Sequence, residues 1–285
     1  MRFRATVPAT SANLGPGFDC FGLALELCNE VVLDTGAAPG VTFEGEGAAE
    51  LPADGSDMIS RAFLHVARAA GAAAPAFALH GVNRIPLERG LGSSAAACVA
   101  GIMLADRVLA LDFEPDDILD LAIELEGHPD NAAAAIVGGF TLAFGDGVLR
   151  LDAAAELRPV ALIPDLRLST VQARAALPQT VSLADAVFNA SHAAAAVVAL
   201  TSRPEMLAEV LGDRLHQDAR LSLVPTVKAV FDELRDAQIP VCVSGAGPTL
   251  LAFELPGVDV PDPGEGWRVL RLPVRTSGAK VQEEG

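Results

Sequence analysis

Apolar residues along this chain either alternate with polar ones or recur at helical spacing. The alternation over residues 2–7 and 29–34 predicts two strands, and residues 57–70 have the apolar spacing of a helix. Further helices are expected at 93–110, 115–126, 182–200, 204–211 and 226–237, with a short Ala-rich helix reaching Gly138. Further strands are expected at 140–144, 148–151, 159–163, 166–170, 241–244, 249–254 and 267–274, the first two as a hairpin around residues 145–147.

The order of these elements indicates the fold class. Strands and helices come in groups and do not alternate strictly, which favours an α+β fold over a doubly wound parallel sheet. The chain has 285 residues, of which 51% are hydrophobic, enough for two fused subdomains with a large core. We place the boundary near Asp152, which gives an N-terminal unit of residues 1–152 and a C-terminal unit of residues 153–285.

Charge and hydropathy narrow the classes of partner. The formal net charge of -17 opposes binding to nucleic acid or to an anionic membrane, because both require a basic surface. An anionic ligand must therefore be met by local donors or by a metal ion. Apolar runs are short, and the first residues alternate like a strand without the apolar core of a signal peptide. We expect a cytoplasmic protein that does not bind membranes.

The cysteines and histidines have no metal-site spacing. Cys20, Cys28, Cys98 and Cys242 are scattered in apolar or small-residue surroundings and form no C-x-x-C pair. Buried free thiols are the better interpretation. The five histidines likewise show no pairwise metal spacing, and His128 is best explained by the turn that it begins.

A segment rich in glycine and serine precedes the helix expected at residue 93. Its small residues allow backbone N–H groups to approach an anion, and the first turn of the helix adds unpaired N–H groups and its dipole. This is a phosphate cradle without the lysine of a Walker A loop, so serine hydroxyls and magnesium must do more. Its members are Pro86, Gly90, Leu91, Gly92, Ser93, Ser94, Ala95 and Ala96.

Two other interpretations fit the same segment. A tight turn with a serine cap explains the glycines equally well. A dinucleotide-binding fingerprint also matches G-x-G-x-x-A, with Asp106 and Asp112 downstream. Pro86, Glu88 and Arg89 oppose that second interpretation, because a buried central strand should be apolar there.

Two more glycine-rich segments lie near the ends of the chain. Residues 7–22 form a turn-rich loop in which the amide of Asn13 and the carboxylate of Asp19 stand among hydroxyls. A purely structural loop would need the glycines but not all of these polar groups. Residues 243–249 form a glycine turn between two apolar strands, which taken alone indicates a tight hairpin.

Together the three segments resemble the three motifs of the GHMP kinase superfamily, and most closely those of its homoserine kinase family. The resemblance covers nearly the whole chain. Its most specific parts are Pro-Ala-Thr-Ser-Ala-Asn-Leu-Gly-Pro-Gly-Phe-Asp, Glu-Gly-His-Pro-Asp-Asn, Ser-Thr-Val-Gln-Ala-Arg-Ala-Ala-Leu-Pro and Ser-Gly-Ala-Gly-Pro-Thr. It implies two α+β subdomains, the first like ribosomal protein S5, with ATP and substrate in the cleft between them. It also implies phosphorylation of the side-chain hydroxyl of L-homoserine to O-phosphohomoserine, a step of threonine synthesis.

The resemblance also implies roles for individual residues. Residues 90–96 would wrap the triphosphate, and Ser94 with Glu124 would hold Mg²⁺, with Glu126 as the rival ligand. Arg174 and Arg220 match the positions that bind the substrate carboxylate, although Arg220 also fits an ordinary surface arginine. The positions that match the lining of the homoserine pocket are Asn13, Asp19, Asn131 and Thr170.

The implied catalytic positions are Asp19 and Asn131. Asn131 stands where mevalonate kinase-like relatives carry an aspartate that activates the hydroxyl, and an amide cannot accept that proton. We therefore predict catalysis by positioning and charge neutralisation, with the proton passing to Asp19, to water or to phosphate. The alternatives are a GHMP kinase for another alcohol, a non-catalytic ligand-binding member, or a dinucleotide oxidoreductase. A homodimer is a further expectation from the resemblance.

Overall fold

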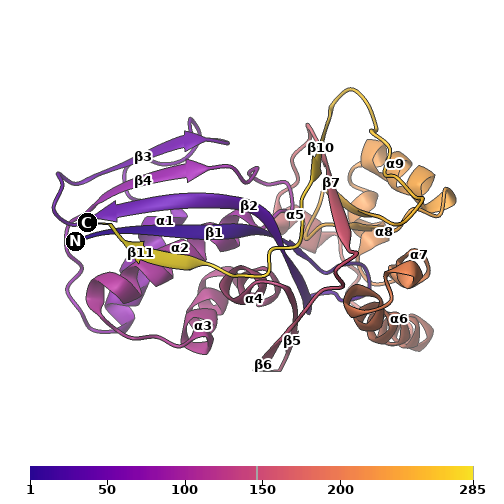
Figure 1. Ribbon diagram of the computed structural model, residues 1–285, viewed down its shortest axis with the longest axis horizontal. Helices are drawn as coiled ribbons and strands as arrows, with labels where there is room; N and C mark the ends of the chain where they lie inside the picture. Colours follow the sequence, from indigo (N-terminus) through magenta and orange to yellow (C-terminus); the bar gives the residue numbers. More distant parts are fainter. Residues whose placement is uncertain (146, 285) are drawn as a thin grey trace.

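Two β-sheets organise the chain, and the computed structural model describes residues 1–145 and 147–284 (Figure 1). The first sheet has the order β11-β1-β2-β4-β3, and β5 extends it by pairing with β2 and β6. Its strands are β1 (Arg2–Ala12), β2 (Phe21–Asp34), β3 (Gly40–Gly45), β4 (Ala78–Asn83), β5 (Phe140–Phe144), β6 (Gly147–Leu151) and β11 (Lys280–Glu283). The second sheet has the order β10-β7-β9-β8, from β7 (Arg158–Pro164), β8 (Val241–Val243), β9 (Leu250–Glu254) and β10 (Trp267–Arg271). The predicted α+β fold class is confirmed.

Four helices lie on one face of the first sheet (Figure 1). They are α1 (Met58–Ala69), α2 (Ser93–Leu109), α3 (Pro115–Glu126) and α4 (Asp130–Val137), close to their predicted bounds. The carboxylate of Asp57 caps α1 by accepting the N–H of Ser60, and Pro115 occupies the first turn of α3. α2 is buried along most of its length between the sheet and its neighbours, which fixes the position of its first turn.

The remaining helices come from the part of the chain that follows β7. They are α5 (Thr170–Ala175), α6 (Leu183–Thr201), the 3₁₀ turn η1 (Pro204–Met206), α7 (Leu207–Val210), α8 (Gln217–Leu221) and α9 (Pro225–Asp236). Val227, Phe231 and Leu234 of α9 pack on Val160 and Leu250 of the sheet in a separate apolar cluster. This cluster holds α9 against the second sheet.

Several predicted elements differ from the structure. β1 and β2 are longer than expected, and they stay paired on both sides of a register shift between Pro8 and Ala9. The strand predicted at 166–170 is wrong: the side chain of Ser169 accepts the N–H of Gln172 and starts α5 instead. β3, β4, α8 and β11 were not predicted. The middle residue of the predicted hairpin turn, residue 146, lies outside the described residues.

The last strand returns to the first sheet. The chain leaves that sheet after β6 and then forms the second sheet and the remaining helices. β11 then pairs antiparallel with β1, in a register from Phe3 opposite Glu283 to Thr6 opposite Lys280. The two termini consequently lie side by side (Figure 1). The first sheet therefore contains residues from both ends of the sequence.

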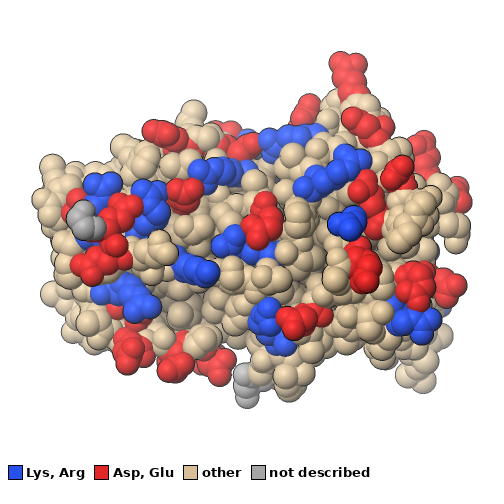
Figure 2. Space-filling view, viewed as in Figure 1, with Lys and Arg blue, Asp and Glu red and all other residues tan. Residues whose placement is uncertain are grey.

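Acidic and basic side chains are interspersed on the face of the molecule shown in Figure 2.

Among the described residues, α6 is the one helix whose length and mean hydropathy of 1.5 would suit a membrane span. Ala196, Ala199 and Leu200 of that helix are buried in the core.

All four cysteines are free, and burial raises the pKa of Cys98 and of Cys242 to about 12.

Candidate active site

The three glycine-rich segments meet at one place in the structure. The N–H of Thr10 donates to the carbonyl of Leu91 at 3.1 Å, and the N–H of Gly245 donates to the carbonyl of Ala12 at 3.0 Å. The hydroxyl of Ser244 donates to the carbonyl of Gly90 at 2.7 Å. Three segments that lie far apart in the sequence thus form one wall.

The Gly90 loop has a backbone that only glycine fits. Gly90 and Gly92 have φ of +75° and +70°, and a Cβ on either would overlap a neighbouring oxygen, that of Ser244 or of Thr10 respectively. Gly92 is the N-cap of α2, and the first backbone bond of the helix runs from Ala96 N–H to Gly92 O at 2.8 Å. The N–H groups of residues 93–95 therefore remain for an anion.

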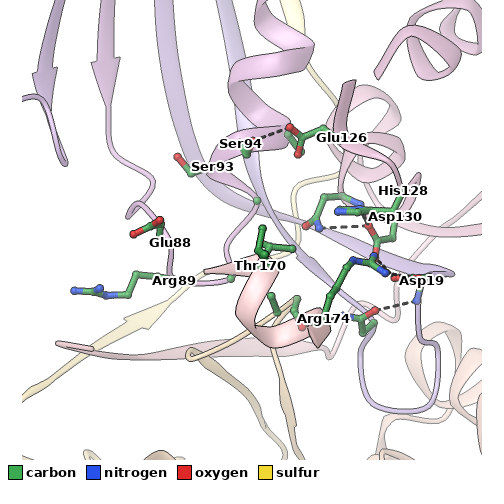
Figure 3. A pocket seen from close by; sticks show the side chains of 18 of the residues that line it. Asp19, Glu88, Arg89, Ser93, Ser94, Glu126, His128, Asp130, Thr170 and Arg174 are labelled. Atoms are coloured by element: carbon green, nitrogen blue, oxygen red, sulfur yellow. Dashed lines mark hydrogen bonds and ion pairs between the residues drawn. The ribbon is translucent and has the colours of Figure 1, made fainter. Parts of the chain in front are cut away.

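A cavity of about 400 Å³ opens in front of this loop (Figure 3). It brings together most of the predicted residues: Asn13, Asp19, Pro86, Gly90, Gly92, Ser93, Ser94, Ala95, Asn131, Thr170, Arg174 and Arg220. Leu91 and Ala96 are not in its lining, because the Leu91 side chain is buried in the core and the Ala96 N–H is used within the helix. The phosphate cradle is thus narrower than residues 90–96.

The two candidate metal ligands on α3 have different surroundings. Glu126 lines the cavity and accepts a hydrogen bond from the hydroxyl of Ser94 at 2.7 Å. The Glu124 side chain is 62% exposed and pairs with His65 on the surface at 2.9 Å. The structure therefore brings Glu126, and not Glu124, to the phosphate loop. Within residues 1–145 and 147–284 there is no cluster of three or more His, Cys, Asp or Glu side chains suited to a metal.

The opposite end of the cavity carries two arginines and a carboxylate. Arg174 from α5 makes a two-pronged contact with Asp19 at 2.8 and 3.1 Å (Figure 3). The backbone N–H of Asp19 donates to Asn13 at 2.9 Å, which fixes the loop of the first segment. Arg220 is only 3% exposed, so it is not the surface arginine that was the alternative. Burial lowers its pKa to about 10, and it remains charged at neutral pH.

Asn131 joins the two ends of the cavity. Its side-chain oxygen accepts the hydroxyl of Thr10 at 2.8 Å, beside Gly92 of the phosphate loop. Its backbone N–H donates to the buried carboxylate of Asp130 at 2.7 Å. Asp130 also bonds the ring of His128 at 2.8 Å and thereby raises the pKa of that histidine. His128 thus has a cavity position beyond its predicted role in the turn.

A second cavity of about 330 Å³ adjoins the first. It shares Glu88, Ser93 and Ser94 with the first cavity and extends toward the start of α1. Asp57 lies in its wall, and one carboxylate oxygen of this buried side chain has no hydrogen-bond partner among the described residues. Because Ser93 and Ser94 line both cavities, a ligand that fills both of them would pass the first turn of α2.

The sequence did not single out three groups in this region. The ring of Phe18 lies under both Arg174 and Arg220, with distances of 5.9 and 5.3 Å from the guanidinium carbons to its centroid. Asp130 and His216 are the others, and both are buried polar residues. Phe18 could have been noticed as a large apolar residue among the polar groups of the first loop. Nothing local marks His216.

The dinucleotide interpretation gains no support from the site. Asp106, the acidic residue that it requires, is buried and accepts the backbone N–H of Phe113 at 3.0 Å. Asp106 and Asp112 are absent from the lining of both cavities described above.

Comparison with known proteins agrees with this geometry. Residues 57–139 match the family model described as the GHMP kinases N terminal domain. The matched region contains the glycine loop and the first turn of α2. Together with relatives that are more than 40% identical over almost their whole length, this match shows that the chain belongs to the GHMP kinase superfamily. Within that superfamily it belongs to the homoserine kinase family.

Three relatives support the second assignment. The chain is 41% identical to the homoserine kinase of Clavibacter michiganensis, over 99% of this chain and 94% of the relative. It is 43% identical to that of Streptomyces avermitilis, over 98% and 95% of the two chains. The crystal structure of homoserine kinase from Cytophaga hutchinsonii superposes with a TM-score of 0.83 at 26% identity, covering 99% of this chain and 97% of that one.

Proposed function

We propose that this chain transfers the γ-phosphoryl group of ATP to the side-chain hydroxyl of L-homoserine, forming O-phospho-L-homoserine for threonine synthesis. The observation that carries the proposal is a single cavity with two different ends. One end is the first turn of a long buried helix, which suits phosphate. The other end holds Arg174, Arg220 and Asp19, which suit an amino-acid zwitterion.

The nucleotide spans the two adjoining cavities in this proposal. The free N–H groups of residues 93–95 bind the phosphates, and the base occupies the cavity beside Asp57. Ser94 and Glu126 supply oxygen ligands of the kind that Mg²⁺ prefers, and the remaining ligands come from phosphate and water. Bound Mg²⁺ would neutralise charge on the phosphates.

The amino acid binds at the arginine end. Its carboxylate meets Arg174 and Arg220, and its ammonium group meets the carboxylate of Asp19. Its side chain then points toward Asn131, which contacts the phosphate loop through Thr10. This orientation places the hydroxyl between the amino-acid end and the phosphate end of the cavity.

Catalysis follows from this placement. A loose phosphoryl-transfer transition state needs alignment and charge neutralisation more than a strong base. Asn131 cannot accept the proton of the hydroxyl. We propose that the proton passes to Asp19, to water or directly to phosphate, and that Asn131 orients the hydroxyl.

A coupled ADP-release assay tests the proposed function. The panel contains L-homoserine, L-serine, L-threonine, mevalonate and galactose with ATP and Mg²⁺. Selective turnover of homoserine, lost in Ser94→Ala and Arg174→Ala, is the expected result. Arg203→Ala is the matched control, because Arg203 is an exposed arginine paired only with Glu205 in the described structure. Turnover of another alcohol would move the substrate assignment, and no turnover at all would favour a ligand-binding protein.

The resemblance to homoserine kinases also supports a cytoplasmic homodimer that binds neither nucleic acid nor membrane. The net charge of -17 favours neither anionic partner. Light scattering on the purified protein measures the number of chains directly.

A further inference from the structure

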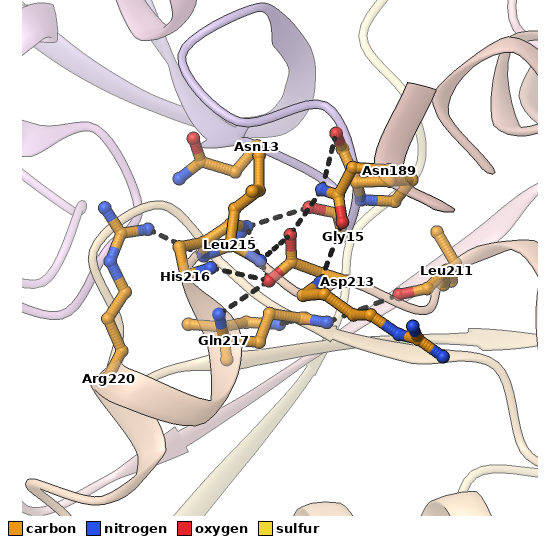
Figure 4. A network of polar contacts seen from close by, with 12 residues as sticks. Asn13, Gly15, Asn189, Leu211, Asp213, Leu215, His216, Gln217 and Arg220 are labelled. Carbon is orange, nitrogen blue, oxygen red and sulfur yellow. Dashed lines mark hydrogen bonds and ion pairs between the residues drawn. The ribbon is translucent and has the colours of Figure 1, made fainter. Parts of the chain in front are cut away.

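A buried polar network lies behind the arginine end of the cavity (Figure 4). Its centre is His216, whose side chain has 0% exposure. His216 precedes α8, and Arg220 stands on that helix four residues later. Figure 4 shows the imidazole between the Gly15 backbone and the Arg220 guanidinium.

The hydrogen bonds of His216 define its tautomer. Its Nε2 lies 2.8 Å from the carbonyl oxygen of Gly15, which can only accept, so Nε2 carries the proton and donates. Its Nδ1 lies 3.1 Å from Nη1 of Arg220, which can only donate, so Nδ1 accepts. Burial lowers the pKa of His216 to about 4, so the ring is neutral at physiological pH. One neutral ring therefore connects the first glycine-rich loop to the arginine.

The carboxylate of Asp213 holds the histidine in place. It is fully buried and accepts the backbone N–H groups of His216 and Gln217, each at 2.8 Å. It also accepts the side-chain amide of Asn189 at 2.7 Å. These bonds fix the turn that leads into α8, and the ring of His216 stacks on Phe18 at 5.2 Å.

The hydrogen bonds that the described residues make to the Arg220 guanidinium all involve Nη1. Nη1 is committed to His216 Nδ1 and to the carbonyl of Gly245, the latter at 2.7 Å. Nε is buried and has no hydrogen-bond partner among the described residues. The edge made by Nε and Nη2 can form two parallel hydrogen bonds with a carboxylate. Because Arg220 lines the cavity, this geometry suits a bound carboxylate.

We propose that His216 is a positioning residue that orients the guanidinium of Arg220 toward the carboxylate of the amino-acid substrate. The inference rests on the proposed function, since it assigns that carboxylate to Arg220. Two acceptors on Nη1 fix the plane of the guanidinium, and removing the imidazole acceptor releases one of them. His216 thus governs the affinity for the amino acid without touching either substrate.

Two substitutions separate the two hydrogen bonds of the ring. In His216→Asn the amide oxygen stands at the position of Nδ1, so the acceptor for Arg220 is retained and the bond to Gly15 is lost. In His216→Gln the amide nitrogen reaches the position of Nε2, so the bond to Gly15 is retained and the acceptor for Arg220 is lost. The variants are similar in size and polarity and serve as controls for each other.

Steady-state kinetics with homoserine and ATP test the proposal. His216→Gln is expected to raise KM for homoserine by about 10-fold or more, the range for losing a buried hydrogen bond to a charged group. KM for ATP should stay within about twofold in both variants. His216→Asn should keep KM for homoserine within about threefold of the unsubstituted protein. Equal rises in both variants, or parallel rises for homoserine and ATP, would overturn the proposal and make the ring merely structural.

A double substitution adds a readout that a structural role would not move. In an Arg220→Ala background, His216→Gln should raise KM for homoserine no further, because the group that it orients is gone. A full additional rise would refute the proposal. If His216→Gln does not fold, His216→Asn still decides, since a 10-fold rise in a folded protein contradicts the retained acceptor. Absence of homoserine turnover in the unsubstituted protein would instead refute the proposed function.

Discussion

The substitution Gly92→Ala tests how strictly the backbone of the phosphate loop is set. Gly92 has φ of +70°, where an alanine costs about 1–2 kcal/mol. Its Cβ would overlap Thr10 Oγ1 and stand 3.2 Å from Asn131 Oδ1, so the hydrogen bond between these two side chains must break. That bond contributes about 1 kcal/mol more. We expect a total loss of about 2–3 kcal/mol in the free energy of unfolding.

The catalytic effect should exceed the loss of stability. Gly92 caps the helix whose first N–H groups face the cavity, and a displacement of about 1 Å at such a site can cost about 100-fold in rate. We therefore expect kcat to fall by about 100-fold in the coupled ADP-release assay.

Gly71→Ala is the matched control for this substitution. Gly71 has φ of +61°, and no atom lies within 4 Å of the added Cβ, so Gly71→Ala introduces backbone strain without any steric overlap. It should lose about 1–2 kcal/mol of unfolding free energy in urea titrations and keep its kcat within about twofold. Equal effects of the two alanines on kcat would refute the reasoning from the Thr10 and Asn131 contacts.

Three further predictions concern single side chains. Glu126→Gln should raise the Mg²⁺ concentration for half-maximal activity at least about 10-fold, and Glu124→Gln should not; equal effects in a Mg²⁺ titration would contradict the metal assignment. Asp19→Asn should lower turnover moderately, whereas total loss of turnover with homoserine binding intact in calorimetry would make Asp19 an essential base. His216 stays neutral in the folded state down to about pH 4, while in the unfolded chain it gains a proton below about 6.5. The contribution of His216 to the free energy of unfolding is therefore complete above pH 6.5 and falls by about 3 kcal/mol toward pH 4. Urea titrations of His216→Asn over the same pH range should not show this decrease.

Much of the site was predictable because its chemistry depends on small residues in fixed backbone conformations. Gly90 and Gly92 adopt positive φ, and the helix begins at Ser93, as the glycine and serine pattern indicates. Arg174 and Asn131 were also predictable, because the resemblance assigns roles to their motifs. The fold class followed from the grouping of apolar segments.

The choice between neighbouring glutamates could not be predicted from the sequence. Glu124 and Glu126 both lie in the last turns of α3, and residues two apart point to different sides of a helix. Which side faces α2 depends on tertiary packing. The positions of Arg220 and His216 depend in the same way on the turn at Asp213, whose four hydrogen bonds join residues without any periodic pattern.

The missed strands are short and show weak apolar patterns. β3 alternates Val41 and Phe43 with polar residues, but it has only six residues and none of them is fully buried. β11 has only four residues, and β4 places Gly81 and Asn83 at two of its three buried positions. β1 was underestimated because Pro8, Thr10 and Ser11 interrupt its apolar pattern, although residues 8–12 are buried. Burial in this part of β1 comes from the convergence of the three loops.

The pairing of β11 with β1 has a consequence for synthesis on the ribosome. β1 can pair with β2 as soon as both strands have been translated, but its other edge acquires a partner only when residues 280–283 have been made. Until then one edge of β1 presents unpaired N–H and C=O groups to other chains. A stop codon shortly before Lys280 would preserve every residue that lines the cavity but would leave that edge of β1 permanently exposed. Such a truncated chain would lose activity through aggregation and not through the loss of catalytic groups.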